Sequence, residues 1–463
     1  MYFSKVNFAG FIKKFGFWVI TVIYLVILLF AKNIPVFWDM YGQVKTANYF
    51  LETNFSDLFP DGNTFSDNGH FPLYALYLAL LFKIFGLKLW LAHLSVLPFL
   101  FGILWQLQKF CKLFLSELQT FFVLLFTLFH PAFITQSIYF SNEIAIVFFS
   151  LWMINSILYE RSSHIALASI FLCLLNLRGI SLCIILLIYF LIAKRNKNAW
   201  YLLCGLIIWT SWLFIHCKIT GWFFAGEEIK EFRALATPEM MVRNFLISLW
   251  KIIDLGSVFG WAAILAVALK RKTSGEPLVL LMLVSLAVIL TCVPTGNPVS
   301  NRYFLISYVL LLPAFIYSVG FLDKKLPVVI PVCFAIVLFS NNGVMYPNKY
   351  GNAWDCSLKS LAYFDLRKQL DGYVAEQKIS PKEVSAGFQL YFNDKFYLMN
   401  GTEKEYGLLS DTEMPRSEYV ADSDICNNYD ELRNQFLKER YSPVKTFKSG
   451  AVYINLFRKN PKP

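Results

Sequence analysis

Residues 16–34, GFWVITVIYLVILLFAKNI, decide the fold class, because no charged residue interrupts them before Lys32. An apolar segment of about 20 residues can cross a bilayer as a helix. Lys5, Lys13 and Lys14 precede this one. It is too long for the core of an ordinary signal peptide, and no small-residue cleavage site follows it. We therefore expect a retained first span with its N-terminus in the cytoplasm.

The rest of the chain repeats this apolar pattern. Of the 463 residues, 57% are hydrophobic and 16% charged, whereas soluble domains carry about 25% charged residues. The later apolar blocks are 71–86, 89–107, 118–133, 143–159, 164–178, 180–193, 199–216, 244–269, 277–293, 302–320 and 326–340. This pattern predicts an α-helical integral membrane protein.

The basic residues predict the topology. If every block crossed the membrane, the clusters at 194–197, 270–272 and 323–325 would lie outside, against the positive-inside rule. The conflict disappears if block 71–86, which is short and carries Tyr74, Tyr77 and Lys83, lies along the interface instead. We therefore expect about eleven spans, a juxtamembrane helix in the first outer loop, and a multi-pass membrane protein.

From Asn341 onward the composition is that of a soluble domain. We expect a transmembrane domain over 1–340 and a small extracytoplasmic α/β domain over 341–463. The expected elements are an amphipathic helix at 359–377, strands at 383–388 and 418–421, and a terminal hairpin from 444–447 and 451–457. Cys356 and Cys426 fall in this region, where a disulfide between them is possible if it is extracytoplasmic.

The net charge of +11 does not indicate nucleic-acid binding. The basic residues form short clusters between apolar blocks, as membrane topology requires. The sequence has no basic helix and no aromatic-basic sheet pattern of the kind that binds nucleic acid. The nine cysteines include no CxxC or Cys/His metal spacing.

Two acids are candidates for catalysis. Asp39 follows Trp38 just beyond the first span, where a lower local polarity can tune a carboxylate to accept a proton. The other interpretation is a solvated loop acid, which residue chemistry alone favours. Glu143 enters block 143–159 from outside, where it can orient a base, bind a metal or cap a helix.

Several residues are candidates for holding a phosphate or substrate. Arg178, amid apolar residues, needs a partner, which can be a lipid phosphate or a neighbouring carboxylate. Arg302, followed by Tyr303, can meet a phosphate or anchor the interface. Asp67, His70 and Tyr74 surround a turn and the Pro-led start of block 71–86, where a helix N-terminus and a histidine can hold a phosphate.

These residues occur in an order that resembles the GT-C superfamily of polytopic glycosyltransferases, which includes protein O-mannosyltransferases and the lipid A aminoarabinose transferases. The series over about residues 15–320 is WD at 38–39, GHFPLYALYLALLFKIFG at 69–86, LAHLSVLP at 91–98, HPAFITQSIYFSNE at 130–143, LRG at 177–179 and NRYFLISYVLLLP at 301–313. The chain departs from the family pattern at several positions: Met40 follows Asp39 where Glu is common, Asn142-Glu143 stands where Asp is common, and Phe71 replaces a proline.

The resemblance implies an inverting transfer of a monosaccharide from a polyprenyl-phosphate carrier to a lipid, glycan or protein acceptor at the outer face. Because the chain lacks the large luminal insert of many eukaryotic O-mannosyltransferases, we expect it in a bacterial inner membrane. Asp39 matches the family's catalytic base, and Glu143 lies near its second acid. His70, Arg178 and Arg302 would neutralise the leaving phosphate. Trp38, Asp67, Tyr74 and Tyr303 would contact substrate. No cofactor is required by the sequence, and a divalent metal is possible.

Two other functions remain open. A transporter or flippase usually has polar or broken spans near the midplane, often in paired halves, and the sequence suggests neither. A non-catalytic assembly partner, with the tail binding another protein, is the third hypothesis. The sequence does not specify the sugar, the acceptor or the oligomeric state.

Overall fold

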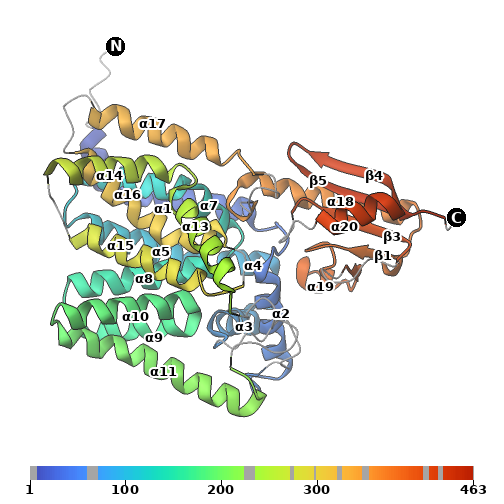
Figure 1. Cartoon of the computed structure of the whole chain (residues 1–463), viewed down its shortest axis with the longest axis horizontal. Coiled ribbons are helices and arrows are strands. Elements are labelled where there is room, and N and C mark those ends of the chain that lie inside the picture. The colour runs from blue at the N-terminus through green and yellow to red at the C-terminus, as the bar shows by residue number, and fades with distance from the viewer. Residues whose placement is uncertain are drawn as a thin grey trace.

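The computed structural model describes residues 8–59, 71–223, 235–271, 276–296, 299–320, 326–346, 354–409, 417–425 and 431–461. Figure 1 shows a bundle of helices with a smaller sheet-containing region beside it at the C-terminus. The predicted fold class, an α-helical membrane protein with a small C-terminal α/β region, is confirmed.

The helices of the first half follow the predicted blocks with breaks between some of them. Their bounds are α1 Phe8–Ala31, α2 Asp39–Glu52, α3 Leu73–Phe85, α4 Leu89–Leu94, α5 Leu97–Cys111, α6 Glu117–Phe129, α7 Pro131–Ile138, α8 Asn142–Leu158, α9 Ser162–Leu175, α10 Leu177–Ile192 and α11 Asn196–Thr220. Because α3 has 13 residues, its length of about 20 Å is shorter than the hydrocarbon core of about 30 Å. It packs against α2, as an interfacial helix would.

The second half completes the bundle. Its helices are α13 Pro238–Ile253, α14 Ser257–Arg271, α15 Glu276–Cys292, α16 Leu305–Val319 and α17 Leu326–Asn341. The block 244–269, predicted as one span, is divided into two helices, since α13 and α14 meet at an angle of 84°. The break coincides with left-handed backbone at Leu255 and Gly256, with φ of 53° and 84°. The Asp254 carboxylate accepts a hydrogen bond from Leu255 N there.

Four described helices are long and apolar enough to cross a membrane, namely Gly10–Ala31, Leu89–Cys111, Asn196–Thr220 and Asn301–Val319, and the number rises to six if two bent pairs count as single spans. Shorter apolar helices account for the remaining blocks within the described ranges. The expected number of eleven spans therefore stays a prediction.

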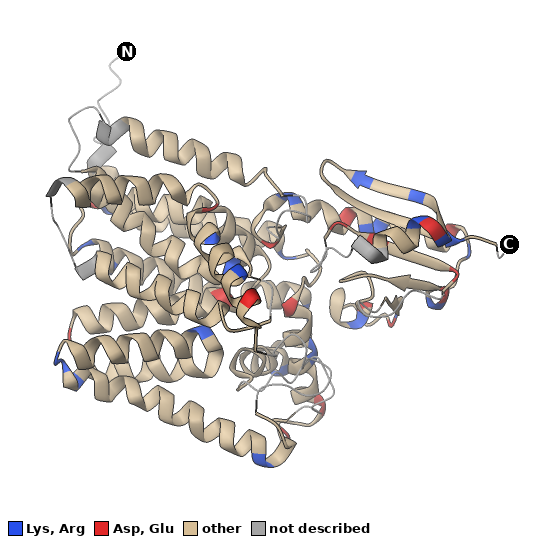
Figure 2. Ribbon diagram, in the orientation of Figure 1, with Lys and Arg blue, Asp and Glu red and all other residues tan. Residues whose placement is uncertain are grey.

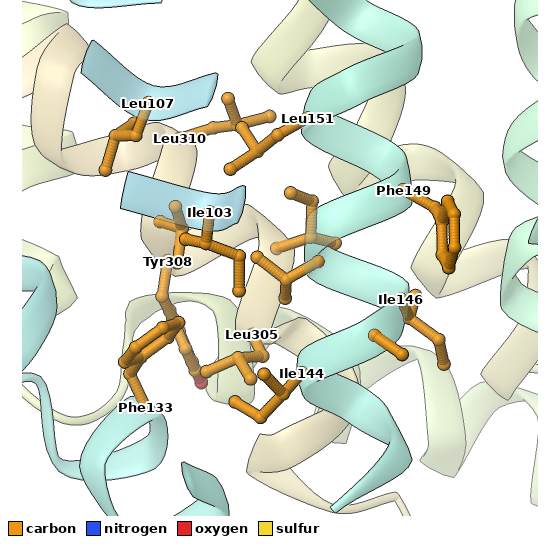
Figure 3. Close-up of a cluster of buried hydrophobic side chains, with 14 of the residues drawn as sticks. Ile103, Leu107, Phe133, Ile144, Ile146, Phe149, Leu151, Leu305, Tyr308 and Leu310 are labelled. Carbon is orange, nitrogen blue, oxygen red and sulfur yellow. The ribbon is translucent and has the colours of Figure 1, made fainter. Parts of the chain in front are cut away.

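Helix α16 is the centre of the bundle. All its residues except Tyr317 are buried, and a helix that is apolar all round belongs inside a membrane protein. Figure 3 shows how α5, α8 and α16 interlock through the side chains of Ile103, Leu107, Ile144, Leu151, Leu305 and Leu310. By contrast, α1 and α11 are buried over only 28% of their most apolar windows, so their exposed faces suit contact with lipid.

The helix directions define two ends of this bundle. We call the end where α1 finishes and α8, α10 and α16 begin the near end, and the opposite end the distal end. The near end carries α2 and α3 and contacts the C-terminal region (Figure 1). Figure 2 shows that charged residues are rare along the helices. Which end faces the cytoplasm stays a prediction.

The C-terminal region contains a five-stranded mixed sheet with the order β2-β1-β3-β5-β4. Its elements are α18 Ala362–Glu376, β1 Val384–Ala386, α19 Asp394–Tyr397, β2 Gly407–Leu408, β3 Tyr419–Ser423, α20 Glu431–Arg440, β4 Tyr441–Ser449 and β5 Val452–Lys459. The predicted helix, strands and terminal hairpin are confirmed. Alternate residues Val452, Ile454 and Leu456 of β5 are fully buried, as the period-2 pattern requires.

The C-terminal region also shares an apolar cluster with the near end. Leu366 and Leu370 of α18 belong to the same buried cluster as Ala31, Phe37 and Tyr139. Cys356 is buried at this junction, and burial raises the pKa of its thiol. Cys426 lies outside the described residues, so a disulfide between the two stays a prediction. The shared cluster means that residues after 341 are placed to contribute to a site at the near end.

Candidate functional site

Asp39 is the first residue of α2 and lies at the near end. The residue before it, Trp38, has a left-handed backbone with φ of 53°, a conformation that costs about 1–3 kcal/mol for a non-glycine residue. The C-terminal region supports it: Trp38 N donates to Gln389 Oε1 at 3.2 Å. The Trp38 ring packs on Trp354 and Phe388, with ring centroids 4.4 and 4.0 Å away. This support holds Asp39 with 58% of its side chain exposed.

Arg302 comes from a short 3-10 helix, Asn301–Phe304, that leads into α16. Its side chain is only 7% exposed, and its Nη2 donates to Asp39 Oδ2 at 2.8 Å. On its other side, Nε lies 3.5 Å from Asp355 Oδ2. One buried guanidinium is therefore shared between an exposed and a buried carboxylate. Within the described part of the chain, Asp39 Oδ1 accepts no hydrogen bond.

Asp355 is itself held in place. Ser300 Oγ donates to Asp355 Oδ2 at 2.6 Å, and Gln136 Nε2 donates to the Asp355 carbonyl oxygen at 2.7 Å. A buried carboxylate needs such partners because burying it unpaired is costly. Asp355 thus joins α7, the 300–302 turn and the C-terminal region at one point.

A second ion pair, Arg178 with Glu143, lies beside the first. Arg178 is near the start of α10, where the side chain of Asn176 caps the helix by accepting from Arg178 N at 3.1 Å. Its Nη2 donates to Glu143 Oε1, and both side chains are buried. Of the two partners that the sequence left open for Arg178, the structure has the carboxylate. Ser141 rather than Glu143 supplies the side-chain cap of α8.

Tyr303 connects the two ion pairs. The guanidinium carbon of Arg178 is 4.3 Å from the centre of the Tyr303 ring, and that of Arg302 is 5.3 Å from it. Cation–π contacts of this kind are attractive and strengthen when the groups are desolvated. The two arginines therefore lie on one aromatic side chain and concentrate positive charge at the near end.

A pocket begins at the second ion pair. Glu143, Ser150, Arg178 and Tyr303 form its polar part, and apolar side chains of α8, α10, α15 and α16 form the rest, including Val147, Leu182, Val284, Val288 and Ile306. The pocket has a volume of about 10 Å³, room for no more than one water molecule. Its lining, cationic at one end and aliphatic along the walls, matches the head and chain of an anionic lipid in chemistry but not in space.

A buried polar network supports the 301–302 turn. The Asn301 amide accepts from Lys251 Nζ at 2.7 Å and donates to Asp254 Oδ2 at 2.8 Å. Lys251 and Asp254, which are three residues apart, therefore bind the oxygen and the nitrogen of the same side-chain amide. Tyr346 OH also donates to Asp254, at 2.8 Å. Such a satisfied network fixes backbone geometry, here next to Arg302.

The sequence-based candidates are partly brought together. Asp39, Glu143, Arg178, Arg302 and Tyr303 converge from four separate segments, with Trp38 beside them. His70 and Asp67 lie outside the described residues.

Tyr74 is buried, and its hydroxyl donates to the Phe140 carbonyl oxygen at 2.7 Å. No contact in the described ranges joins Tyr74 to the two ion pairs. Its role in binding substrate stays a prediction.

Asp355 was missed by sequence reasoning. Its signal was nonetheless present, because Trp354-Asp355 repeats the Trp38-Asp39 dipeptide in a region taken to be a separate domain. Among the described residues, no group of three or more His, Cys, Asp or Glu side chains is placed to hold a metal ion.

Comparisons with known proteins bear on the fold. No protein-family model and no curated protein sequence matches the chain. Two solved structures do match, both crystal structures of ArnT from Cupriavidus metallidurans. The one bound to undecaprenyl phosphate has a TM-score of 0.55 and 12% identity, and covers 96% of this chain and 98% of its own. The apo structure also has a TM-score of 0.55, with 11% identity and coverage of 95% and 97%. The chain therefore has the fold of ArnT, from its helical bundle through its C-terminal region.

Proposed function

We propose that this protein is an inverting glycosyltransferase that moves a monosaccharide from a polyprenyl-phosphate carrier to an acceptor hydroxyl at the outer face of a bacterial inner membrane. The observation that carries the proposal is the convergence of Asp39, Arg302, Arg178 and Glu143 at the near end, next to a pocket with aliphatic walls. The ArnT fold supports it, since one of the two matching structures is bound to undecaprenyl phosphate.

In the proposed reaction Asp39 is the general base. Its exposed carboxylate removes the proton from the acceptor hydroxyl while the hydroxyl oxygen forms a bond to the anomeric carbon. The bond from that carbon to the carrier phosphate breaks, and polyprenyl phosphate leaves with the electron pair. The Arg302 contact to Oδ2 orients the carboxylate so that Oδ1 faces the acceptor.

The two arginines have the complementary role. Negative charge develops on the phosphate oxygen as the glycosidic bond breaks, and fixed guanidinium groups stabilise it most in a water-poor site. Arg178 lies at the polar end of the pocket, so we assign it to the carrier phosphate, with Arg302 between phosphate and base. Glu143 then keeps Arg178 oriented and compensates its charge before substrate binds.

The carrier chain would follow the aliphatic side of the pocket between α8, α10, α15 and α16, and these helices must move apart to admit it because the pocket has a volume of about 10 Å³. We place the acceptor on the other side of Asp39, towards Trp38 and the C-terminal region, because that side of the carboxylate is exposed. Under this proposal residues 1–340 form the catalytic transmembrane domain, and residues 341–463 form an extracytoplasmic domain that completes the site through Asp355.

The test uses purified protein in detergent and a panel of radiolabelled polyprenyl-phosphate sugars, with native membrane extract as the source of acceptor. Wild type should release label from one donor. Asp39→Asn should lose about 10²–10⁴-fold in rate, the typical contribution of a general base. Asp365→Asn is the matched control, because Asp365 is an exposed acid on α18, and it should retain full activity.

Two outcomes would contradict the proposal. If no donor is bound or consumed by wild type or variant, the protein is not a glycosyltransferase of this class. If lipid-linked sugar crosses proteoliposome membranes without any acceptor and Asp39→Asn leaves that flux unchanged, the transporter hypothesis is correct instead.

A further inference from the structure

A second polar pocket lies at the distal end, far along α8 from the ion pairs. It has a volume of about 180 Å³, much more than a single water molecule needs. Side chains of α5, α8 and α9 form it, and those with polar or aromatic groups include Trp105, Lys109, Trp152, Asn155, Arg161 and His164. The proposed transfer reaction assigns no role to these residues.

The charges in this pocket have one sign. Lys109 and Arg161 both line it, and no carboxylate does so. Neither base forms an ion pair with an acid in the described part of the chain. Two cations that share a pocket repel each other, so an anion between them would relieve the repulsion. This arrangement differs from the near end, where each arginine already has a carboxylate.

The third basic residue, His164, is arranged as a hydrogen-bond donor. Trp152 Nε1 donates to His164 Nδ1 at 3.1 Å. Because Nδ1 accepts a hydrogen bond, the ring is in the tautomer that carries its proton on Nε2. A neutral N–H group and two cationic side chains make a set of donors that suits phosphate oxygens.

Asn155 adds a complementary group. It is 2% exposed, and its Nδ2 donates to the carbonyl oxygen and to Oε1 of Gln106, at 2.7 and 2.8 Å. Its Oδ1 is buried and has no hydrogen-bond partner among the described residues. A buried acceptor of this kind is costly unless a ligand or water donates to it. A ligand with a hydroxyl group or ammonium next to its phosphate would do so.

The pocket also borders a surface suited to acyl chains. Trp105 is 48% exposed, and Phe101, one turn earlier on α5, is 40% exposed. The Phe101 ring lies near Trp18 of α1, which is 58% exposed. Exposed tryptophans of this kind mark the interfacial level of a bilayer. Arg161, in contrast, is exposed at the helix ends, so the pocket lies between an aqueous edge and an apolar face.

We infer that the distal pocket binds the phosphate headgroup of an anionic glycerophospholipid, with Lys109, Arg161 and His164 on the phosphate and Asn155 Oδ1 on a headgroup hydroxyl. Basic pockets between transmembrane helices recognise lipid headgroups by this chemistry. The acyl chains extend along the outer face of α1 and α5. This site is separate from the one proposed for transfer, and its test needs no enzymatic activity.

Native mass spectrometry of the full-length protein tests the inference. The probe is phosphatidylglycerol, added to detergent micelles in competition with phosphatidylcholine. Wild type should retain phosphatidylglycerol preferentially. Lys109→Gln combined with Arg161→Gln should reduce its apparent affinity about tenfold or more. The matched control is Lys112→Gln with Lys194→Gln, two exposed distal lysines that do not line the pocket, and it should bind like wild type.

A further variant and a second ligand make the result decisive. Arg161→Glu changes only an exposed side chain and should abolish the preference without lowering the thermal stability of the lipid-free protein. Equal retention by wild type and the pocket variants would overturn the inference, as would equal losses in the pocket and control variants. Protection against thermal unfolding by inorganic phosphate, without preferential retention of phosphatidylglycerol, would also overturn it and identify a site for free phosphate.

Discussion

The near and distal ends of the bundle use basic residues in opposite ways. At the near end Arg178 and Arg302 are buried, and each binds a carboxylate. At the distal end Lys109 and Arg161 line a pocket without an acid. Burying a guanidinium is tolerated only with a partner, whereas bases at a membrane surface need none. The difference indicates that the near-end arginines have positions fixed by the protein, and that the distal bases are available to bind a ligand from outside.

The largest difference in stability between the two ends is expected from removing a near-end carboxylate. Glu143→Ala leaves the Arg178 charge buried without compensation and should lower the free energy of unfolding by about 3–5 kcal/mol. Lys112→Ala at the distal end removes an exposed charge and should change it by less than about 0.5 kcal/mol. Circular dichroism during unfolding in detergent measures the stability of both variants. Similar stabilities for the two variants would show that the buried pair is not fixed by the fold.

The second prediction separates the role of Arg302 from that of Asp355, its buried carboxylate partner. Arg302→Gln should reduce the transfer rate by about 10²–10³-fold, the usual effect of losing a group that stabilises charge in the transition state. Asp355→Asn keeps the guanidinium and disturbs only its orientation, so the loss should be smaller, on the order of tenfold. Transfer rates measured for both variants at saturating donor concentration test this difference. A larger loss for Asp355→Asn would assign the main role to Asp355.

The third prediction concerns the tight turn that places Arg178. A Cβ added at Gly179 would lie 2.2 Å from the Leu172 carbonyl oxygen of α9, so Gly179→Ala must push α9 and α10 apart and should destabilise by about 1–3 kcal/mol. Gly372→Ala is the control, since Gly372 lies in α18 with open space around its Cβ position, and alanine should stabilise that helix slightly. If Gly179→Ala and Gly372→Ala changed stability equally, the close contact between α9 and α10 would not contribute to stability.

The last prediction is a pH dependence outside the bundle. Burial raises the pKa of Asp424 to about 6, against about 3.9 in an unfolded chain. Between these values the folded state retains a proton that the unfolded state has lost, so this group's contribution to stability falls as pH rises from about 4 to about 6.

Asp424→Asn removes that dependence and keeps an oxygen that can accept from Tyr453 N, as Asp424 Oδ1 does at 2.9 Å. The melting temperature of the variant relative to wild type should therefore increase between pH 4.5 and pH 7. A difference that does not vary with pH would contradict the raised pKa.

The sequence by itself determined the elements and most of the charged residues of the site. Apolar blocks of helical length determined the bundle, because a bilayer leaves few alternatives for the backbone. The alternation of Val452, Ile454 and Leu456 determined the terminal hairpin. Asp39, Arg178 and Arg302 were identifiable because charged residues next to apolar spans are costly unless they have a role.

Only the tertiary structure decided which of these charges meet. Asp39 and Arg302 are separated by 263 positions, and no local pattern encodes their contact. The same holds for Asp355, which reaches Arg302 because the C-terminal region packs on the near end through the cluster around Phe37 and Leu366. The 84° bend after α13 was likewise hidden, since Asp254 is held there by Asn301 and Tyr346 from distant parts of the chain. Local propensity acts over a few residues, whereas these contacts depend on how separate helices pack.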